Sequence, residues 1–146
     1  MLDNVFYGNE LYADKTDEEK ATALKDSSMQ NLLMRFDGGL EAQINGSGEG
    51  MSLGQKQLIA FMRAVLREPE LLILDEATAN IDTVTEQLLE ETLKALPSKT
   101  AKVIIAHRLN TIESADEIFF VNAGEITPAG SLEKAVELLM SGKRAS

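Results

Sequence analysis

The sequence contains no cysteine, and His107 is its only histidine. Without cysteine, the chain has no disulfide framework, no cysteine-ligated zinc and no thiol nucleophile. A single histidine also excludes a metal site built from several histidine ligands. No apolar run approaches the roughly 20 residues that a membrane-spanning helix needs. The first residues, Met1–Asn4, lack the basic and then apolar pattern of a signal peptide. From these absences we expect a soluble α/β domain of the cytosol.

Positive charge is also scarce, because 14 lysines and arginines stand against 24 aspartates and glutamates, for a net charge of −10. An acidic surface repels the phosphates of nucleic acids and of anionic lipids, so we expect no nucleic-acid partner. A local anion site is compatible with this charge, so a site for ATP stays open. The 146 residues suit one domain or a large part of one, and 44% hydrophobic and 26% charged residues are typical of a folded protein.

Apolar residues at helical spacing, together with capping residues, predict several helices. The expected helices span residues 14–26, 28–36, 52–68 and 82–96, followed by a short helix after Asn110 and a closing helix from Ser131. Asp82 can cap the helix over 82–96, and the apolar face of the helix over 28–36 consists of Met29, Leu32, Leu33 and Phe36. In a capping box, the residue before the helix pairs with a glutamate or glutamine three residues later. The spacing fits Thr16 with Glu19, Ser52 with Gln55, and Asn110 with Glu113.

Three short apolar runs and one further segment, Glu125–Thr127, predict strands. They span Leu71–Leu74, Val103–Ala106, Ile118–Val121 and Glu125–Thr127, with Asn122-Ala123-Gly124 as a turn between the last two. The first run is short and stops abruptly at Asp75-Glu76, which favours a buried strand. Strands and helices alternate over this half of the chain, so we expect an α/β fold with a parallel, two-faced sheet and right-handed crossovers.

Two of these strands deliver polar residues at their carboxyl ends. Asp75 and Glu76 follow the first strand, and His107 follows the second. Ligands of open parallel sheets bind along that edge, so the three side chains are expected to be neighbours. The aspartate is suited to hold Mg²⁺, and the glutamate to orient or deprotonate a water molecule. The alternative is that all three merely cap strand ends or helix starts.

A glycine-rich segment, Gly48–Gln55, leads into the helix that starts at Ser52. A helix N-terminus offers unpaired N–H groups and a partial positive charge, and glycines let a phosphate approach the backbone. The segment is therefore a candidate phosphate-facing element. Taken alone, it fits an ordinary turn with a serine cap at least as well.

Four motifs together resemble the ATP-binding cassette (ABC) ATPases. They are Met51-Ser52-Leu53-Gly54-Gln55 (the signature motif, usually Leu-Ser-Gly-Gly-Gln), Leu71-Leu72-Ile73-Leu74-Asp75-Glu76 (Walker B), Ala79-Asn80-Ile81-Asp82 (the D-loop) and Ile105-Ala106-His107-Arg108-Leu109 (the H-loop). The order and spacing match the family, and the likeness covers essentially the whole chain. Two further segments, Asp3–Gly8 and Ile44–Gly50, are similar to exporter sequences after the Q-loop and in the X-loop.

The resemblance implies a role for each matched residue. Asp75 holds Mg²⁺ through water, Glu76 is the general base, and His107 contacts the γ-phosphate and positions the attacking water. Ser52, Gly54 and Gln55 contact the γ-phosphate of an ATP held by the opposite cassette, and Asp82 belongs to the dimer-contacting D-loop. The implied ligands are ATP and Mg²⁺. The implied partners are a second nucleotide-binding domain, arranged head to tail, and the transmembrane domain of an exporter, at the cytoplasmic face of the membrane.

The resemblance also implies a partial P-loop NTPase-like parallel sheet with an ABC α-helical subdomain. Residues 1–68 would form the helical subdomain, and residues 69–146 the later part of the ATPase core. No glycine begins the P-loop pattern of Gly, four residues, Gly, Lys and Ser or Thr. We therefore expect that the chain alone neither binds ATP tightly nor hydrolyses it. One departure is Leu53, which stands where the signature motif usually has glycine.

Two other functions remain open. The chain is either a free-standing module that offers Ser52, Gly54 and Gln55 in trans to a complete cassette, or part of a soluble ABC ATPase without a membrane partner. The exporter-like segments favour an exporter over the second of these.

Overall fold

The structure is a computed structural model that describes residues 1–44, 50–75, 81–105 and 113–142. The chain forms two compact units, Met1–Val103 and Ile104–Ser146, which are described separately. The predicted division into a helical subdomain (residues 1–68) and part of the ATPase core (residues 69–146) is a different one and stays a prediction. Within the described ranges, no helix is both long and apolar enough to span a bilayer.

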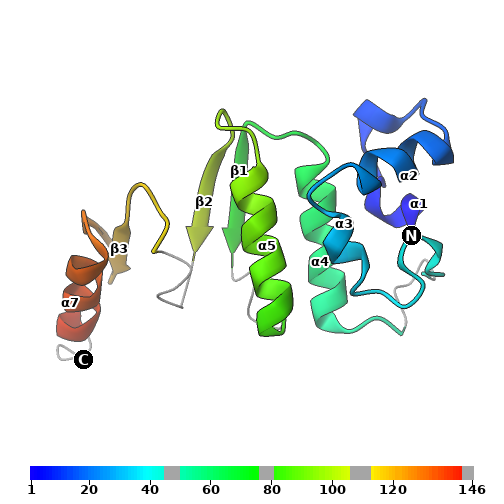
Figure 1. Cartoon of the computed structure of the whole chain (residues 1–146). Helices are drawn as coiled ribbons and strands as arrows, with labels where there is room; N and C mark the ends of the chain where they lie inside the picture. Colours follow the sequence, from blue (N-terminus) through cyan, green and yellow to red (C-terminus); the bar gives the residue numbers. More distant parts are fainter. Residues whose placement is uncertain (45–49, 76–80, 106–112, 143–146) are drawn as a thin grey trace. The chain divides into compact units, whose positions relative to one another are not determined.

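The first unit is mainly helical, with a pair of strands near its end (Figure 1). Its elements are α1 (Leu2–Val5), the 3₁₀ turn η1 (Glu10–Tyr12), α2 (Asp17–Lys25), α3 (Gln30–Leu33), the 3₁₀ turn η2 (Gly39–Glu41), α4 (Leu53–Val65), β1 (Leu71–Asp75), α5 (Thr83–Ala95) and the first three residues of β2 (Ala101–Ile105).

Two predicted capping boxes are confirmed. At α2, the Thr16 hydroxyl accepts a hydrogen bond from the Glu19 backbone N–H, and the Glu19 carboxylate accepts one from the Thr16 N–H. Ser52 and Gln55 form the same pair at α4. The third predicted pair begins at Asn110, which lies outside the described residues, as does the start of the short helix expected there.

The helix predicted over residues 28–36 is much shorter than expected. Only Gln30–Leu33 is α-helical, and the chain then continues in tighter turns, with the N–H groups of Arg35 and Phe36 bonded three residues back. No side chain caps its start, and Gly38 follows at φ 85°, a left-handed conformation that ends the helical path. The predicted apolar face is nevertheless correct, because its four side chains, Met29, Leu32, Leu33 and Phe36, are all buried.

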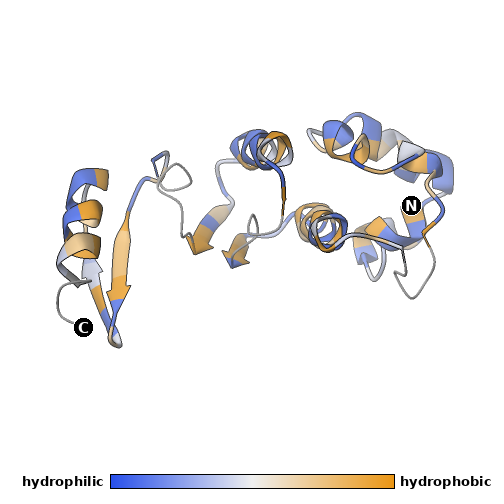
Figure 2. Cartoon of the chain, turned by 90° about the horizontal axis from the view of Figure 1, so that it is seen from below, coloured by the Kyte–Doolittle hydropathy of each residue, from blue (hydrophilic) through white to orange (hydrophobic). Residues whose placement is uncertain are grey.

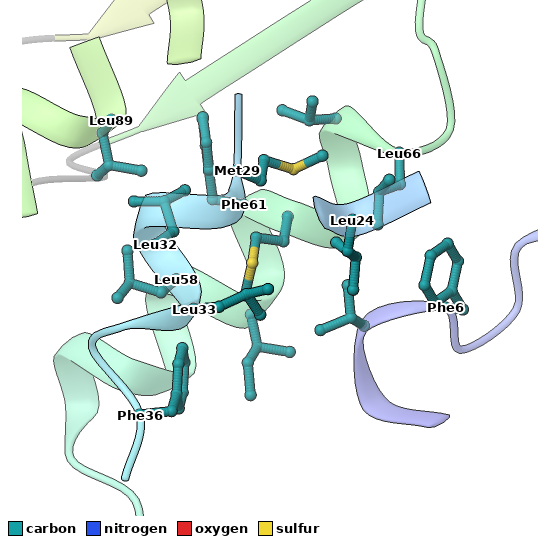
Figure 3. Close-up of a cluster of buried hydrophobic side chains, with 14 of the residues drawn as sticks. Phe6, Leu24, Met29, Leu32, Leu33, Phe36, Leu58, Phe61, Leu66 and Leu89 are labelled. Atoms are coloured by element: carbon teal, nitrogen blue, oxygen red, sulfur yellow. The ribbon is translucent and has the colours of Figure 1, made fainter. Parts of the chain in front are cut away.

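The core of the first unit lies where α3 crosses α4 (Figure 3). Leu58 and Met62 of α4 are almost fully buried, at 2% and 0% exposure, and Leu32 of α3 is completely buried. Contributions also come from Phe6, Leu24 and Leu89, on segments far apart in the sequence. This shared core fixes α4 relative to α3 and α5, and so positions the starts of α4 and α5.

Strands β1 and β2 form a two-stranded sheet in which both arrows run the same way (Figure 1). Leu72 and Leu74 join the core, but Leu71 and Ile73 are 53% and 60% exposed. The prediction of a buried strand is therefore correct for one face of β1 and wrong for the other. Helices α4 and α5 lie on the same side of the sheet (Figure 1). Both strands are coloured mostly as hydrophobic in Figure 2.

The second unit contains a β-hairpin and a helix. Strands β3 (Phe119–Asn122) and β4 (Glu125–Pro128) pair in antiparallel fashion, with Val121 opposite Ile126, and α7 (Leu132–Gly142) follows. The predicted turn at residues 122–124 is confirmed, with Ala123 and Gly124 both at positive φ. In the described residues, β3 pairs with β4 and does not extend the parallel sheet that the alternation of elements predicted.

Candidate functional site

The start of α4 carries the signature-like motif. The Ser52 hydroxyl accepts a hydrogen bond from the Gln55 backbone N–H at 3.1 Å, and the Ser52 N–H donates to Gln55 Oε1 at 3.0 Å. The serine hydroxyl therefore keeps its own proton for donation. The first-turn N–H groups of Leu53 and Gly54 have no acceptor within the helix, because an α-helix leaves its first amides unpaired. With the positive end of the helix dipole, this start suits an anion.

The side chain of Gln55 is held at both ends. Its Oε1 accepts from the Ser52 backbone, while its Nε2 donates to the backbone carbonyl of Arg35 at 3.2 Å. In this conformation the glutamine amide is occupied within the chain. The groups at this end that remain available to a phosphate are thus the Ser52 hydroxyl and the first backbone amides.

Leu53, the departure from the signature motif, is the first residue of α4. Its side chain is 59% exposed. It belongs neither to the buried core nor to the partly buried side chains that pack against the core. Exposure shows that the leucine is not required for packing. It also leaves the side chain room to move aside for a ligand at the helix start.

Asp82 lies at the start of α5. Its Oδ1 accepts from the Thr85 backbone N–H at 3.1 Å, and its Oδ2 accepts from the Thr85 hydroxyl at 2.7 Å and from an Arg35 Nη at 2.6 Å. The hydrogen bonds from Thr85, aided by Arg35, lower the pKa of Asp82 from 3.8 to about 2. The prediction that Asp82 caps this helix is confirmed.

Arg35 therefore touches both helix starts. Its carbonyl accepts from Gln55 of the signature-like motif, and its guanidinium binds Asp82. The sequence reasoning missed this residue, because its partners lie 20 and 47 positions away and no local motif marks such a contact.

Asp75 is the last residue of β1, at the carboxyl end where it was predicted, and its side chain is exposed. A single carboxylate, completed by water and substrate phosphates, is a common protein contribution to a Mg²⁺ site, so Asp75 fits the predicted role. The other two predicted catalytic residues, Glu76 and His107, lie outside the described residues. Over the ranges that the structure describes, no three acidic or histidine side chains gather into a metal site.

A family model described as ABC transporter matches residues 3–79, just over half of the chain. The chain belongs to the ABC transporter family. The matched range includes the start of α4 and all of β1.

Curated ABC proteins are similar along nearly the whole chain. The ABC transporter ATP-binding protein YfiC of Bacillus subtilis is 44% identical over 93% of this chain and 22% of its own length. The multidrug resistance-like ATP-binding protein MdlB of Buchnera aphidicola is 40% identical over 94% of this chain and 24% of its own. A fatty acid ABC transporter ATP-binding/permease protein of Mycobacterium bovis is 37% identical over 90% of this chain. The chain thus spans about a quarter or less of these relatives.

A solved structure also matches. It is a bacterial Atm1-family ABC exporter with ATP bound, which is 31% identical, with a TM-score of 0.66, over 99% of this chain and 24% of the exporter chain. The homologues include exporters, and the fold agrees with the predicted partial P-loop NTPase-like architecture.

Proposed function

We propose that this chain is the signature-to-H-loop part of an exporter-type ABC ATPase, which hydrolyses ATP when a P-loop completes the site. The observation that carries the proposal is the match of 99% of the chain to an exporter with ATP bound. The capped start of α4, with its available hydroxyl and amides, supports it, because that start suits a phosphate.

In this proposal, the start of α4 faces an ATP held by a second nucleotide-binding domain. Ser52 donates its hydroxyl proton to the γ-phosphate, and the backbone near Gly54 donates N–H groups to the same oxygens. Gln55 assists through the capping box that holds Ser52 in place. These donors stabilise the charge of the transferred phosphoryl group by position rather than by covalent chemistry.

Three further residues act on the nucleotide at the sheet edge. Asp75 helps to hold Mg²⁺, which neutralises phosphate charge when bound. Glu76 accepts a proton from the attacking water, and His107 contacts the γ-phosphate and orients that water. Asp82 contributes to the dimer contact from the start of α5.

The partners of the site follow from the same family. A second nucleotide-binding domain supplies the opposite half of each ATP site, and a transmembrane domain converts closure of the pair into export. Leu71 and Ile73 of β1 are apolar and exposed. Their exposure supports the proposal that further polypeptide covers this face of the sheet. The domain then works at the cytoplasmic face of a membrane.

The test is a chimera in which residues 1–146 replace the aligned segment of the Atm1-family exporter, the relative known with ATP bound. We expect the purified chimera to hydrolyse Mg-ATP, and Ser52→Ala to reduce the rate while Thr16→Ala, the other capping-box residue, leaves it unchanged. A folded chimera that binds ATP and never hydrolyses it contradicts the proposal.

The alternatives give different results in companion assays. The chain alone should show no ATP hydrolysis. If it stimulates hydrolysis by a complete cassette whose own signature serine is replaced by alanine, the free-standing trans module is favoured. If the chimera hydrolyses ATP but shows no response to transported substrate, a soluble ABC ATPase is favoured over an exporter.

A further inference from the structure

Arg35 joins two helix starts that the ATP site uses. Its backbone carbonyl accepts the Gln55 Nε2 hydrogen bond at 3.2 Å, and its guanidinium donates to Asp82 Oδ2 at 2.6 Å. Gln55 belongs to the capping box of α4, and Asp82 is the N-cap of α5. Arg35 therefore contacts a capping residue of each helix. Its backbone carbonyl contacts Gln55 of α4, and its side chain contacts Asp82 of α5.

The backbone of Arg35 is well anchored. The adjacent Phe36 and the nearby Leu33 are both 5% exposed and belong to the core between α3 and α4. On the other side, the Thr92 hydroxyl of α5 donates to the Ser28 carbonyl before α3 at 3.3 Å. The segment that carries Arg35 is thus held against α4 and α5. Its backbone is fixed there, and the guanidinium extends from it to Asp82.

We propose that Arg35 is a positioning residue. It holds Asp82, at the start of α5, in a fixed position relative to the start of α4, which carries the signature-like motif. Without Arg35, each helix start keeps its own cap, but the two caps are no longer held relative to each other. The catalytic consequence rests on the proposed function, because it requires both helix starts to meet the second nucleotide-binding domain together.

Stability alone does not test this role. The side chains of Arg35 and Asp82 are 35% and 55% exposed, and exposed ion pairs contribute little to the free energy of unfolding. The test must therefore substitute a residue at the start of one helix and measure amide exchange at the start of the other. An ion pair with only a local effect would leave the distant amides unchanged.

The first experiment uses the 146-residue chain and amide hydrogen exchange measured by NMR. Asp82→Asn keeps an N-cap residue of equal quality but removes the charge that Arg35 binds. We expect exchange at the Gln55 amide, on the other helix, to become faster by about twofold or more. Arg35→Gln should speed exchange at both the Gln55 and Thr85 amides, and Arg35→Lys should restore part of the loss.

Arg67→Gln is the matched control, because Arg67 donates to the carbonyls of Tyr7 and Gly8, away from Asp82. The proposal is overturned if Asp82→Asn and Arg35→Gln leave the Gln55 amide unchanged, or if Arg67→Gln changes it as much.

The second experiment uses the ATP-hydrolysing chimera. Arg35→Gln should lower kcat with KM for ATP unchanged, and Arg35→Lys should recover part of kcat. An unchanged kcat overturns the proposed catalytic consequence. If the unsubstituted chimera is inactive while the exchange coupling is present, the proposed function fails and the positioning role stands.

Discussion

Ser52 and Gln55 bind each other twice at the start of α4, each donating a backbone N–H to the other's side chain. This reciprocal pair fixes the serine hydroxyl beside the first unpaired amides of the helix. The same local structure thus serves stability and, in the proposed ATPase, phosphate contact. Substitutions can separate the two roles, because the chain contains a second capping box, Thr16 with Glu19, on another helix.

Ser52→Ala should lower the free energy of unfolding of the chain by about 1 kcal/mol, since it removes the cap of α4. Thr16→Ala should cost a similar amount at α2, so urea unfolding of both variants gives a matched comparison. In the exporter chimera, only Ser52→Ala should reduce ATP hydrolysis. Equal loss of hydrolysis in both variants would show that Ser52 acts through stability alone.

Leu53→Gly restores the usual signature residue. Because the Leu53 side chain is 59% exposed, we expect ATP hydrolysis by the chimera to be retained or increased, and stability to fall by no more than about 1 kcal/mol. Leu58→Ala, five residues along the same helix and 2% exposed in the parent, should instead cost about 2–5 kcal/mol. A loss of hydrolysis in Leu53→Gly would mean that the leucine contributes to the site.

Asp82 gives the chain a stability component that depends on pH. Its pKa is lowered from 3.8 to about 2 in the folded chain, so the folded state favours the charged carboxylate. This stabilisation is therefore complete above pH 3.8 and is lost as pH falls from 3.8 towards 2. Asp82→Asn should remove this component, and the difference in melting temperature between it and the parent should shrink over that interval. Asp14→Asn, at an exposed aspartate outside any helix, is the control. A constant difference between parent and Asp82→Asn down to pH 2 would contradict the assignment.

The two faces of β1 should respond in opposite ways to substitution. Ile73 is 60% exposed, so Ile73→Thr should leave the stability of the chain nearly unchanged and reduce its binding of a hydrophobic dye. Leu72 is 4% exposed and part of the core, so Leu72→Ala should cost about 2–5 kcal/mol. Similar losses in both variants, measured by urea unfolding, would contradict the described exposure of the strand.

The sequence predicted best those features that depend on neighbouring residues. The caps at Ser52 and Asp82 and the turn at Ala123 and Gly124 were correct, because each follows from side chains and backbone conformations within a few positions. The predicted end of the helix at Phe36 was wrong. Apolar residues continue at helical spacing through Phe36, but the α-helix α3 ends at Leu33.

Features that depend on distant partners were not predictable in this way. The run Leu71–Leu74 is apolar throughout, so its pattern cannot distinguish a strand covered on both sides from one with Leu71 and Ile73 exposed. Arg35 was missed for a related reason, since its ion pair with Asp82 exists only once α3 and α5 have packed. The roles of Glu76 and His107 stay predictions from the family motifs.

The most direct test of the account is the Glu76→Gln variant of the exporter chimera. Glu76 is the proposed general base, and a glutamine of nearly the same shape cannot accept the proton of the attacking water. We predict that Mg-ATP still binds and that phosphate release slows by roughly 100- to 10,000-fold. Phosphate release at the parent rate, from a variant that binds ATP normally, would contradict the assignment of this chain to the hydrolytic half of the ATP site.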